Sequence, residues 1–129
     1  MAVTKIHPIK TTLKKAINYI CNGDKTDDEI YVTTHMCSRE NAYKEFELTK
    51  KQFNSRTKTL AHHLIQSFVP EEVSFEEAHQ VGIELCEKIL GDKYEYVLVI
   101  HIDKDHIHNH IIFNSIDVDE GKVYPVSYT

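Results

Sequence analysis

The sequence predicts an α+β fold in which a mainly antiparallel central sheet has its helices packed on one face. Three helical segments alternate with strand-like segments along the chain, and the last helical segment is followed by two consecutive strand-like segments. No strand-like segment is long and uniformly apolar, as the strands of a doubly wound parallel sheet are. The chain has 129 residues, 41% hydrophobic and 27% charged, so we expect residues 1–129 to form a single domain with its own core.

The first helix is expected from about Thr12 to Cys21. Thr11 is the expected N-cap and Gly23 the expected stop. The apolar residues at helical spacing, which form the predicted buried stripe, are Leu13, Ala16, Ile17 and Ile20.

Two further helices are expected later in the chain. One runs from Ser38 to about Asn54, with Phe46 and Phe53 among its apolar contacts. The other opens at a capping box and stops at Gly91. Its capping pair is Ser74 and Glu77, and the residues that recur at helical spacing are Ala78, Val81, Gly82, Leu85 and Ile89.

The strands are expected between and after these helices. Two of them cover Ile30–Cys37 and His62–Val69, the second ended by Pro70. A hairpin follows, because β-branched and aromatic residues flank a plausible reversal at residues 104–105. The tail from Lys122 to Thr129 is expected to add a short edge strand.

The hairpin segment holds four histidines and two aspartates within ten residues. Alternate residues of a strand share a face, so His108 and His110 point the same way. With a two-residue turn, His101 lies directly opposite His108 and diagonal to His110, at about 5 and 7 Å between Cβ atoms. Three imidazoles then converge on one metal ion, whereas a register slip of one residue puts Asn109 in that position.

The expected ion is divalent. Three neutral nitrogen ligands suit manganese, zinc, cobalt or nickel better than magnesium, which prefers oxygen; the physiological choice among manganese, magnesium and zinc stays open. Three protein ligands leave coordination positions open, which is typical of a catalytic site. The cysteines have no CxxC pairing and lie far from this segment, so we do not expect them to bind zinc: Cys21, Cys37 and Cys86.

Other polar residues have less specific patterns. Asp103 and His106 are expected at the hairpin turn, where either one can hydrogen-bond a ligand imidazole. Tyr19 lies beside the buried stripe of the first helix, next to Lys15, and on the helix alone it is best explained as a boundary residue. The histidines expected to be ordinary polar residues are His7, His35, His62, His63 and His79.

The net charge of −5 argues against a nucleic-acid partner, but the charge is unevenly distributed. Residues 1–60 hold 11 lysines and arginines against 7 acidic residues, while residues 61–129 hold 4 against 13. The first half therefore favours a phosphate-binding face about as strongly as a merely solvated helix. The odd cysteine count, and the lack of a secretory signal or a membrane-spanning apolar run, predict a cytoplasmic protein without a membrane segment.

The histidine segment has the order His-x-Asp followed by His-x-His and an asparagine, at His101, Asp103, His108, His110 and Asn114. This order resembles the metal motif of plasmid mobilisation relaxases, the HUH endonucleases of the MobP type. Tyr19, within Ile17–Ile20, resembles their nucleophile motif. The segment His63–Phe68 resembles their second motif, in which a serine contacts DNA, and that serine is Ser67 here.

The resemblance implies an HUH-endonuclease-like fold and metal-dependent, site- and strand-specific nicking and rejoining of single-stranded DNA. The ion, bound by His101, His108 and His110, polarises the scissile phosphate. Tyr19 attacks phosphorus and leaves a free 3′-hydroxyl and a 5′-phosphotyrosine. Asp103 is implied as a catalytic residue, and whether it assists proton removal or orients a ligand stays open.

The implied partners are single-stranded DNA at an origin of transfer and accessory mobilisation proteins, in the conjugative mobilisation of plasmid or mobile-element DNA. Lysines near the first helix are candidates for backbone phosphate contacts without sequence specificity. The predicted DNA-binding residues are Lys10, Lys14, Lys15, Ser67 and Asn114.

Two alternatives stay open. A rolling-circle replication initiator uses the same chemistry, although in many such proteins the tyrosine follows the histidine pair. A non-catalytic metal- or DNA-binding remnant of a relaxase is the second. The sequence departs from the wider pattern at Asn109, where a hydrophobic residue is usual. It also ends about fifteen residues past Asn114, so we expect a nuclease-domain fragment or shortened copy that lacks C-terminal helices.

Overall fold

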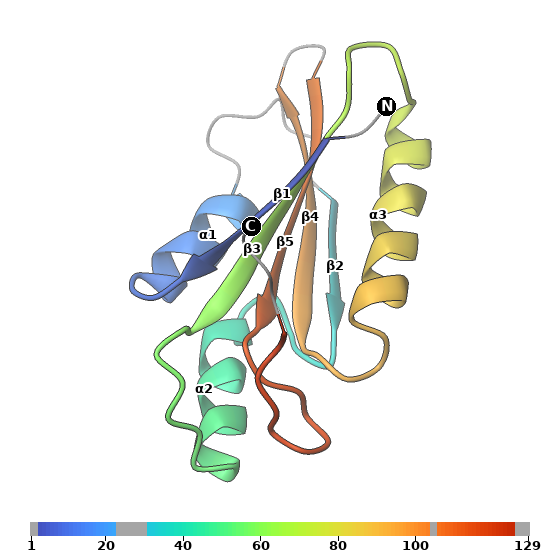
Figure 1. Cartoon of the computed structure of the whole chain (residues 1–129). Helices are drawn as coiled ribbons and strands as arrows, with labels where there is room; N and C mark the ends of the chain where they lie inside the picture. The colour runs from blue at the N-terminus through green and yellow to red at the C-terminus, as the bar shows by residue number, and fades with distance from the viewer. Residues whose placement is uncertain (1–2, 23–30, 104–105, 126–129) are drawn as a thin grey trace.

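The computed structural model describes residues 3–22, 31–103 and 106–125 (Figure 1). Its elements are β1 (Val3–Ile9), α1 (Leu13–Asn22), β2 (Tyr31–His35), α2 (Ala42–Gln52), β3 (Ala61–Ser67), α3 (Phe75–Ile89), β4 (Tyr96–Asp103) and β5 (His106–Asn114). No helix in these ranges is long and apolar enough to cross a membrane.

Parts of the predicted elements lie outside the described residues. These are the stop at Gly23, the start of a strand at Ile30, the turn at residues 104–105 and the last four residues of the tail.

The five strands form one antiparallel sheet in the order β1-β3-β5-β4-β2 (Figure 1). The most apolar strands are interior, and every residue from Val97 to Ile100 on β4 is fully buried. The predicted α+β class with an antiparallel central sheet is therefore confirmed.

The strand β1 was missed by the sequence analysis. It pairs with β3 from Val3 opposite Ser67 to Ile9 opposite Ala61 and forms one edge of the sheet. Most of its side chains are exposed. It also contains Pro8, which an edge strand tolerates because one side of its backbone needs no strand partner. Such a strand lacks the apolar alternation by which a strand is recognised.

Helices cover both faces of the sheet (Figure 1). One core contains residues of α1 and α2 together with Val97, Val99 and Ile112, whereas the other contains residues of α3 together with Leu98 and Ile111. Adjacent residues of a strand point to opposite faces, so these cores are separated by the sheet. The prediction that all helices lie on one face is wrong, because a strand that is apolar at every position must be covered on both sides.

Two helix starts show how local hydrogen bonds set the boundaries. Ser38 does not open α2; its Oγ instead donates to Oε1 of Glu45 over 2.9 Å, and the helix begins at Ala42. The capping box of α3 is confirmed, since Ser74 Oγ accepts from the Glu77 amide and the Glu77 carboxylate accepts from the Ser74 amide. The other boundaries agree with the expected ones within a few residues.

The segment after β5 folds back toward the sheet. The Tyr124 amide donates to the Ser115 carbonyl over 2.8 Å, and Ile116 forms an isolated bridge with Val123. The Tyr124 ring packs 4.8 Å from that of Phe113, which extends the core on the α3 side. In its described part, the tail forms this bridge rather than the edge strand predicted.

Candidate active site

A band of histidines crosses one face of the sheet. Its members lie on four neighbouring strands: His7 on β1, His63 on β3, His108 and His110 on β5, and His101 on β4. Strand register puts all five on the face covered by α1, where Val99 and Ile112 also point. Ring centroids are 5.0 Å apart for His7 and His63, 5.1 Å for His63 and His110, and 4.4 Å for His101 and His110.

The predicted hairpin register is confirmed. His101 lies opposite His108, and Val99 lies opposite His110, so His110 is diagonal to His101. The rings of His108 and His110 are 6.2 Å apart. Asn109 pairs with Ile100 and points to the other face, so the alternative register does not occur. The three predicted metal ligands therefore lie on one face, beside one another.

Each of these three rings has one nitrogen hydrogen-bonded to a residue outside its own strand. His101 Nε2 donates to the Ile20 carbonyl oxygen over 2.7 Å, since a carbonyl only accepts, and in the neutral ring the lone pair is then on Nδ1. His108 Nδ1 lies 3.0 Å from Ser67 Oγ, and His110 Nδ1 lies 2.9 Å from His63 Nε2. These bonds hold one ring to α1 and two rings to β3.

Burial keeps two rings of the band neutral. Desolvation, with smaller contributions from the neighbouring histidines, lowers the pKa of His110 to about 3. The same effect lowers the pKa of His63 to about 4. A neutral imidazole is the form that binds a metal ion, so the protonation state of His110 at neutral pH suits a ligand.

The chemistry of the donors fits a divalent transition metal, and their present orientation does not form a coordination sphere. Within residues 3–22, 31–103 and 106–125, no three histidine, cysteine or acidic side chains are placed to hold one ion. Coordination by His101, His108 and His110 therefore requires one nitrogen of each ring to move closer to the other two. The side chain of Asp103 is not described, and its backbone pairs with His106 at the end of β4.

Tyr19 lies on the last turns of α1, next to the histidine band. Its ring is 56% exposed and lies 6.4 Å from the ring of His101 in an edge-on arrangement. The bond from His101 to the Ile20 carbonyl fixes this end of α1 against β4. The structure therefore places an accessible phenol beside the three predicted ligands.

The predicted DNA-binding residues have different environments. Lys10, Lys14 and Lys15 are all exposed. Lys14 also lines a cavity of about 240 Å³ between α1 and α2, together with Arg39, Lys44 and the acidic Glu40. Ser67 is half-buried, and its hydroxyl contacts His108. In this structure it therefore interacts with the histidine band.

Asn114 lies at the far end of β5 and is fully buried. Its amide donates to the Glu95 carboxylate over 2.9 Å and to the Phe46 carbonyl over 3.2 Å. Burial raises the pKa of Glu95, and the bond from Asn114 opposes that rise. These contacts make Asn114 part of the core between β5 and α2, and they do not support the DNA contact predicted for it.

Asn109 has a structural role that the sequence did not reveal. It is fully buried, and its amide donates to Gln66 Oε1 over 2.9 Å and to the Ala78 carbonyl over 2.8 Å. Gly82 provides the space, since a Cβ there would lie 2.7 Å from the Asn109 amide nitrogen. This asparagine thus joins β5 to β3 and α3 between two predicted ligands, which explains a polar residue at a usually hydrophobic position.

His63, expected to be an ordinary polar residue, instead contacts His110. Four-residue spacing on β3 puts His63 and Ser67 on one face. That parity was available from the sequence, but the pairing of β3 with β5, which brings them to His110 and His108, was not.

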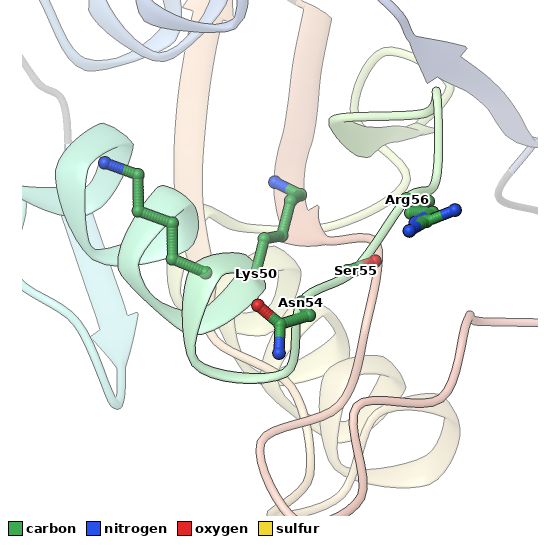
Figure 2. A pocket seen from close by; sticks show the side chains of 5 residues that line it. Lys50, Asn54, Ser55 and Arg56 are labelled. Atoms are coloured by element: carbon green, nitrogen blue, oxygen red, sulfur yellow. The ribbon is translucent and has the colours of Figure 1, made fainter.

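A basic pocket lies at the other end of the molecule, after the C-terminus of α2 (Figure 2). It has a volume of about 610 Å³ and is lined by Lys50, Lys51, Asn54, Ser55 and Arg56. Burial lowers the pKa of Lys50 to about 8. A helix C-terminus carries partial negative charge, so these cations complement the helix dipole and give no independent indication of an anion site.

Comparisons with known proteins agree with this geometry. A family described as "Relaxase: MobA/VirD2-like, nuclease domain" matches residues 19–129. Protein rlx of Staphylococcus aureus is 38% identical over 124 residues, which cover 96% of this chain and 36% of that protein. The group II intron-interrupted relaxase LtrB of Lactococcus lactis subsp. cremoris is 36% identical over an alignment of 132 positions, which covers 82% of this chain and 23% of that protein.

The chain thus spans roughly a third of the length of the rlx relative and about a quarter of that of LtrB. The family match begins at Tyr19 and includes all three proposed metal ligands, His101, His108 and His110. The chain belongs to the MobA/VirD2-like relaxase nuclease-domain family.

Proposed function

We propose that this chain nicks and rejoins single-stranded DNA at an origin of transfer, by metal-dependent transesterification through Tyr19. The observation that supports the proposal most directly is the position of the Tyr19 ring 6.4 Å from His101, on the face where His108 and His110 also lie. The biological role that follows is conjugative mobilisation of plasmid or mobile-element DNA, in the cytoplasm and with accessory mobilisation proteins.

The residues that would bind the ion are His101, His108 and His110. When bound, a divalent ion polarises the scissile phosphate and offsets the charge that builds on its oxygens in the transition state. The three imidazoles lie on one face of the sheet, and the bond from His101 to Ile20 holds His101 against α1.

Tyr19 supplies the nucleophile. Its oxygen forms a bond to phosphorus while the bond from phosphorus to the 3′-oxygen breaks, and the 3′-oxygen leaves as a hydroxyl after taking up a proton. The products are a 5′-phosphotyrosine and a free 3′-hydroxyl, so the reverse attack rejoins the strand. A tyrosine has a pKa of about 10, so its proton must be removed during the reaction. Asp103 is a proposed catalytic residue with two possible roles. It either assists removal of this proton or orients a histidine that binds the ion.

The DNA backbone would run over α1. Lys14 and Lys15 are exposed on this helix, and Lys10 precedes it. Their positive charge lies in the half of the chain that is net basic, and it would contact phosphates without reading bases. Ser67 also remains a proposed DNA contact. Its hydroxyl would then hydrogen-bond a nucleotide in addition to His108.

Incubation with single-stranded oligonucleotides that tile the replicon encoding the chain tests this proposal. With Mn²⁺ present, we expect a covalent protein–DNA adduct on a denaturing gel and a nicked product from one strand only. Tyr19→Phe should remove the adduct and leave Mn²⁺ binding unchanged. An adduct of normal yield in Tyr19→Phe would exclude Tyr19 as the nucleophile.

A second candidate is a non-catalytic metal- or DNA-binding module. The observation that favours it is the absence, among the described residues, of three side chains already arranged around an ion. Retention of an oligonucleotide without any adduct, at Mn²⁺ concentrations that saturate the chain, would support this candidate over the nuclease.

A further inference from the structure

Three residues of the histidine band have an assigned role in the proposed reaction, and two do not. The unassigned pair is His7, exposed on the edge strand β1, and His63, half-buried on β3. Of the two, only His63 contacts a proposed ligand through a hydrogen bond, between its Nε2 and Nδ1 of His110 at 2.9 Å. The contact between His7 and His63 is a ring contact at 5.0 Å between centroids.

An imidazole binds a metal ion through a nitrogen that has no proton. In a neutral ring one nitrogen carries the proton and the other the lone pair, and the hydrogen bond made by one nitrogen decides which is which. For His110, a proton on Nδ1 leaves the lone pair on Nε2. If the proton were on Nε2 instead, that nitrogen could not bind the ion.

We propose that His63 is a positioning residue for the metal site, whose Nε2 accepts a hydrogen bond from Nδ1 of His110 and thereby keeps the His110 lone pair on Nε2. This inference rests on the proposed function, because His110 needs a defined lone pair only if it binds the ion. His63 itself would not touch the metal ion or the DNA.

The partners of the other ligands support this assignment. Ser67, four residues after His63 on the same face of β3, lies 3.0 Å from Nδ1 of His108. His101 is held in the same manner by a different element, through the Ile20 carbonyl. Each proposed ligand thus has one ring nitrogen bonded to a protein atom, and two of the three partners are on β3. Such partners of metal ligands fix ring orientation, and their loss typically weakens metal binding by about 10- to 100-fold.

Antiparallel pairing explains why β3 supplies both partners. Ser67 lies directly opposite His108. His63 lies opposite Ile112 and is therefore diagonal to His110. Diagonal neighbours on one face of a sheet are about 7 Å apart, which long side chains bridge. A histidine at position 63 spans that gap, and its Nε2 reaches His110.

The first test reads the tautomer directly in the metal-free chain. Two-bond ¹H–¹⁵N correlation spectra of the labelled chain distinguish a protonated Nδ1 from a protonated Nε2 in each histidine. We expect His110 to carry its proton on Nδ1, and His63→Leu to convert it to a mixture of both tautomers. A wild-type His110 protonated on Nε2 would overturn the proposal, whether or not the chain cleaves DNA.

The second test measures Co²⁺ binding by calorimetry and by the visible absorption of the bound ion. His63→Leu should weaken binding by about 10- to 100-fold. His63→Gln should retain most of the affinity, because the amide oxygen of glutamine ends near the position of histidine Nε2 and accepts the same bond. His7→Gln is the matched control, since it removes a neighbouring imidazole but no bond to a ligand, and its affinity should equal that of the wild type.

The outcomes separate this inference from the proposed function. Equal weakening in His63→Gln and His63→Leu, with loss of a nitrogen ligand in the absorption spectrum, would make His63 a ligand and overturn the positioning role. Unchanged affinity in His63→Leu would overturn it as well. A wild-type chain with the expected His110 tautomer that binds no Co²⁺ would instead refute the proposed metal site and leave the hydrogen-bond assignment standing.

Discussion

The imidazole of His101 donates a hydrogen bond from Nε2 to the carbonyl oxygen of Ile20 over 2.7 Å. The last carbonyls of a helix have no intrahelical donor, so this bond satisfies a group that α1 leaves unpaired. It also joins the helix that carries Tyr19 to the strand that carries the first proposed ligand. One side chain thereby sets the distance between the nucleophile and the metal site.

His101→Leu should therefore destabilise the metal-free protein. The Ile20 carbonyl would lose its donor in a buried setting, which costs about 1–3 kcal/mol. Urea unfolding of the metal-free chain measures this change. His106→Leu, an exposed histidine of the same hairpin, is the control and should be nearly neutral. Equal effects of the two variants would contradict the role given to the bond between His101 and Ile20.

Gly82→Ala should destabilise the chain through Asn109. A methyl group at position 82 would lie 2.7 Å from the Asn109 amide nitrogen, and crowding of this kind costs about 1–3 kcal/mol. In the double variant with Asn109→Ala, the methyl group has room. The double variant should therefore lose less free energy of unfolding than the sum of the losses in the two single variants. Denaturant unfolding of all four proteins gives the coupling, and strict additivity would refute the close contact.

Ser67→Ala should weaken Mn²⁺ binding in the absence of DNA. The hydroxyl lies 3.0 Å from His108 Nδ1, and the loss of such a partner lowers metal affinity by about 10-fold or more. Calorimetric titration with Mn²⁺ alone measures it. Lys15→Gln should leave this affinity unchanged, because Lys15 is exposed on α1. If Ser67→Ala binds Mn²⁺ normally and loses only DNA affinity, the serine contacts DNA without supporting the ligand.

Lys50→Met should stabilise the protein at pH 7 and lose that advantage in alkali. The Lys50 ammonium is buried without a hydrogen-bond partner among the described residues, and burial lowers its pKa to about 8. The unfolded chain, with a lysine pKa of about 10.4, binds this proton more tightly. Because of Lys50, the free energy of unfolding of the wild type rises between about pH 8 and about pH 10.4. Below about pH 8 this contribution is absent.

The difference between Lys50→Met and the wild type isolates this lysine from other groups that titrate in alkali. We expect a difference of about 1 kcal/mol at pH 7, reduced by the solvent that the side chain retains, and a smaller one at pH 10. Lys51→Met, exposed on the same helix, is the control. A difference that does not change with pH would show that Lys50 is not the titrating group.

The histidine hairpin could be predicted from the sequence because its information is local. A two-residue turn and strand parity are enough to put His101 opposite His108, and the structure has this register. The capping box of α3 is equally local, since Ser74 and Glu77 are three residues apart. Patterns of this kind depend on neighbours in the chain and not on the final packing.

The features that the sequence missed depend on contacts between distant segments. β1 becomes a strand through its pairing with β3, and His63 acquires its partner through the pairing of β3 with β5. The burial of Asn109 depends on the space that Gly82 leaves on α3. Asn114 was assigned to DNA because of its place in a motif, while its environment is set by α2 and Glu95. None of these relationships follows from spacing along the chain.

A crystal structure of the chain grown with Mn²⁺, with the anomalous scattering of manganese recorded, tests the central claim most directly. The account predicts one strong anomalous peak, about 2.0–2.3 Å from a ring nitrogen of each of His101, His108 and His110, with the Tyr19 hydroxyl facing it. A peak elsewhere, or no peak within bonding distance of these three rings at saturating Mn²⁺, would contradict it.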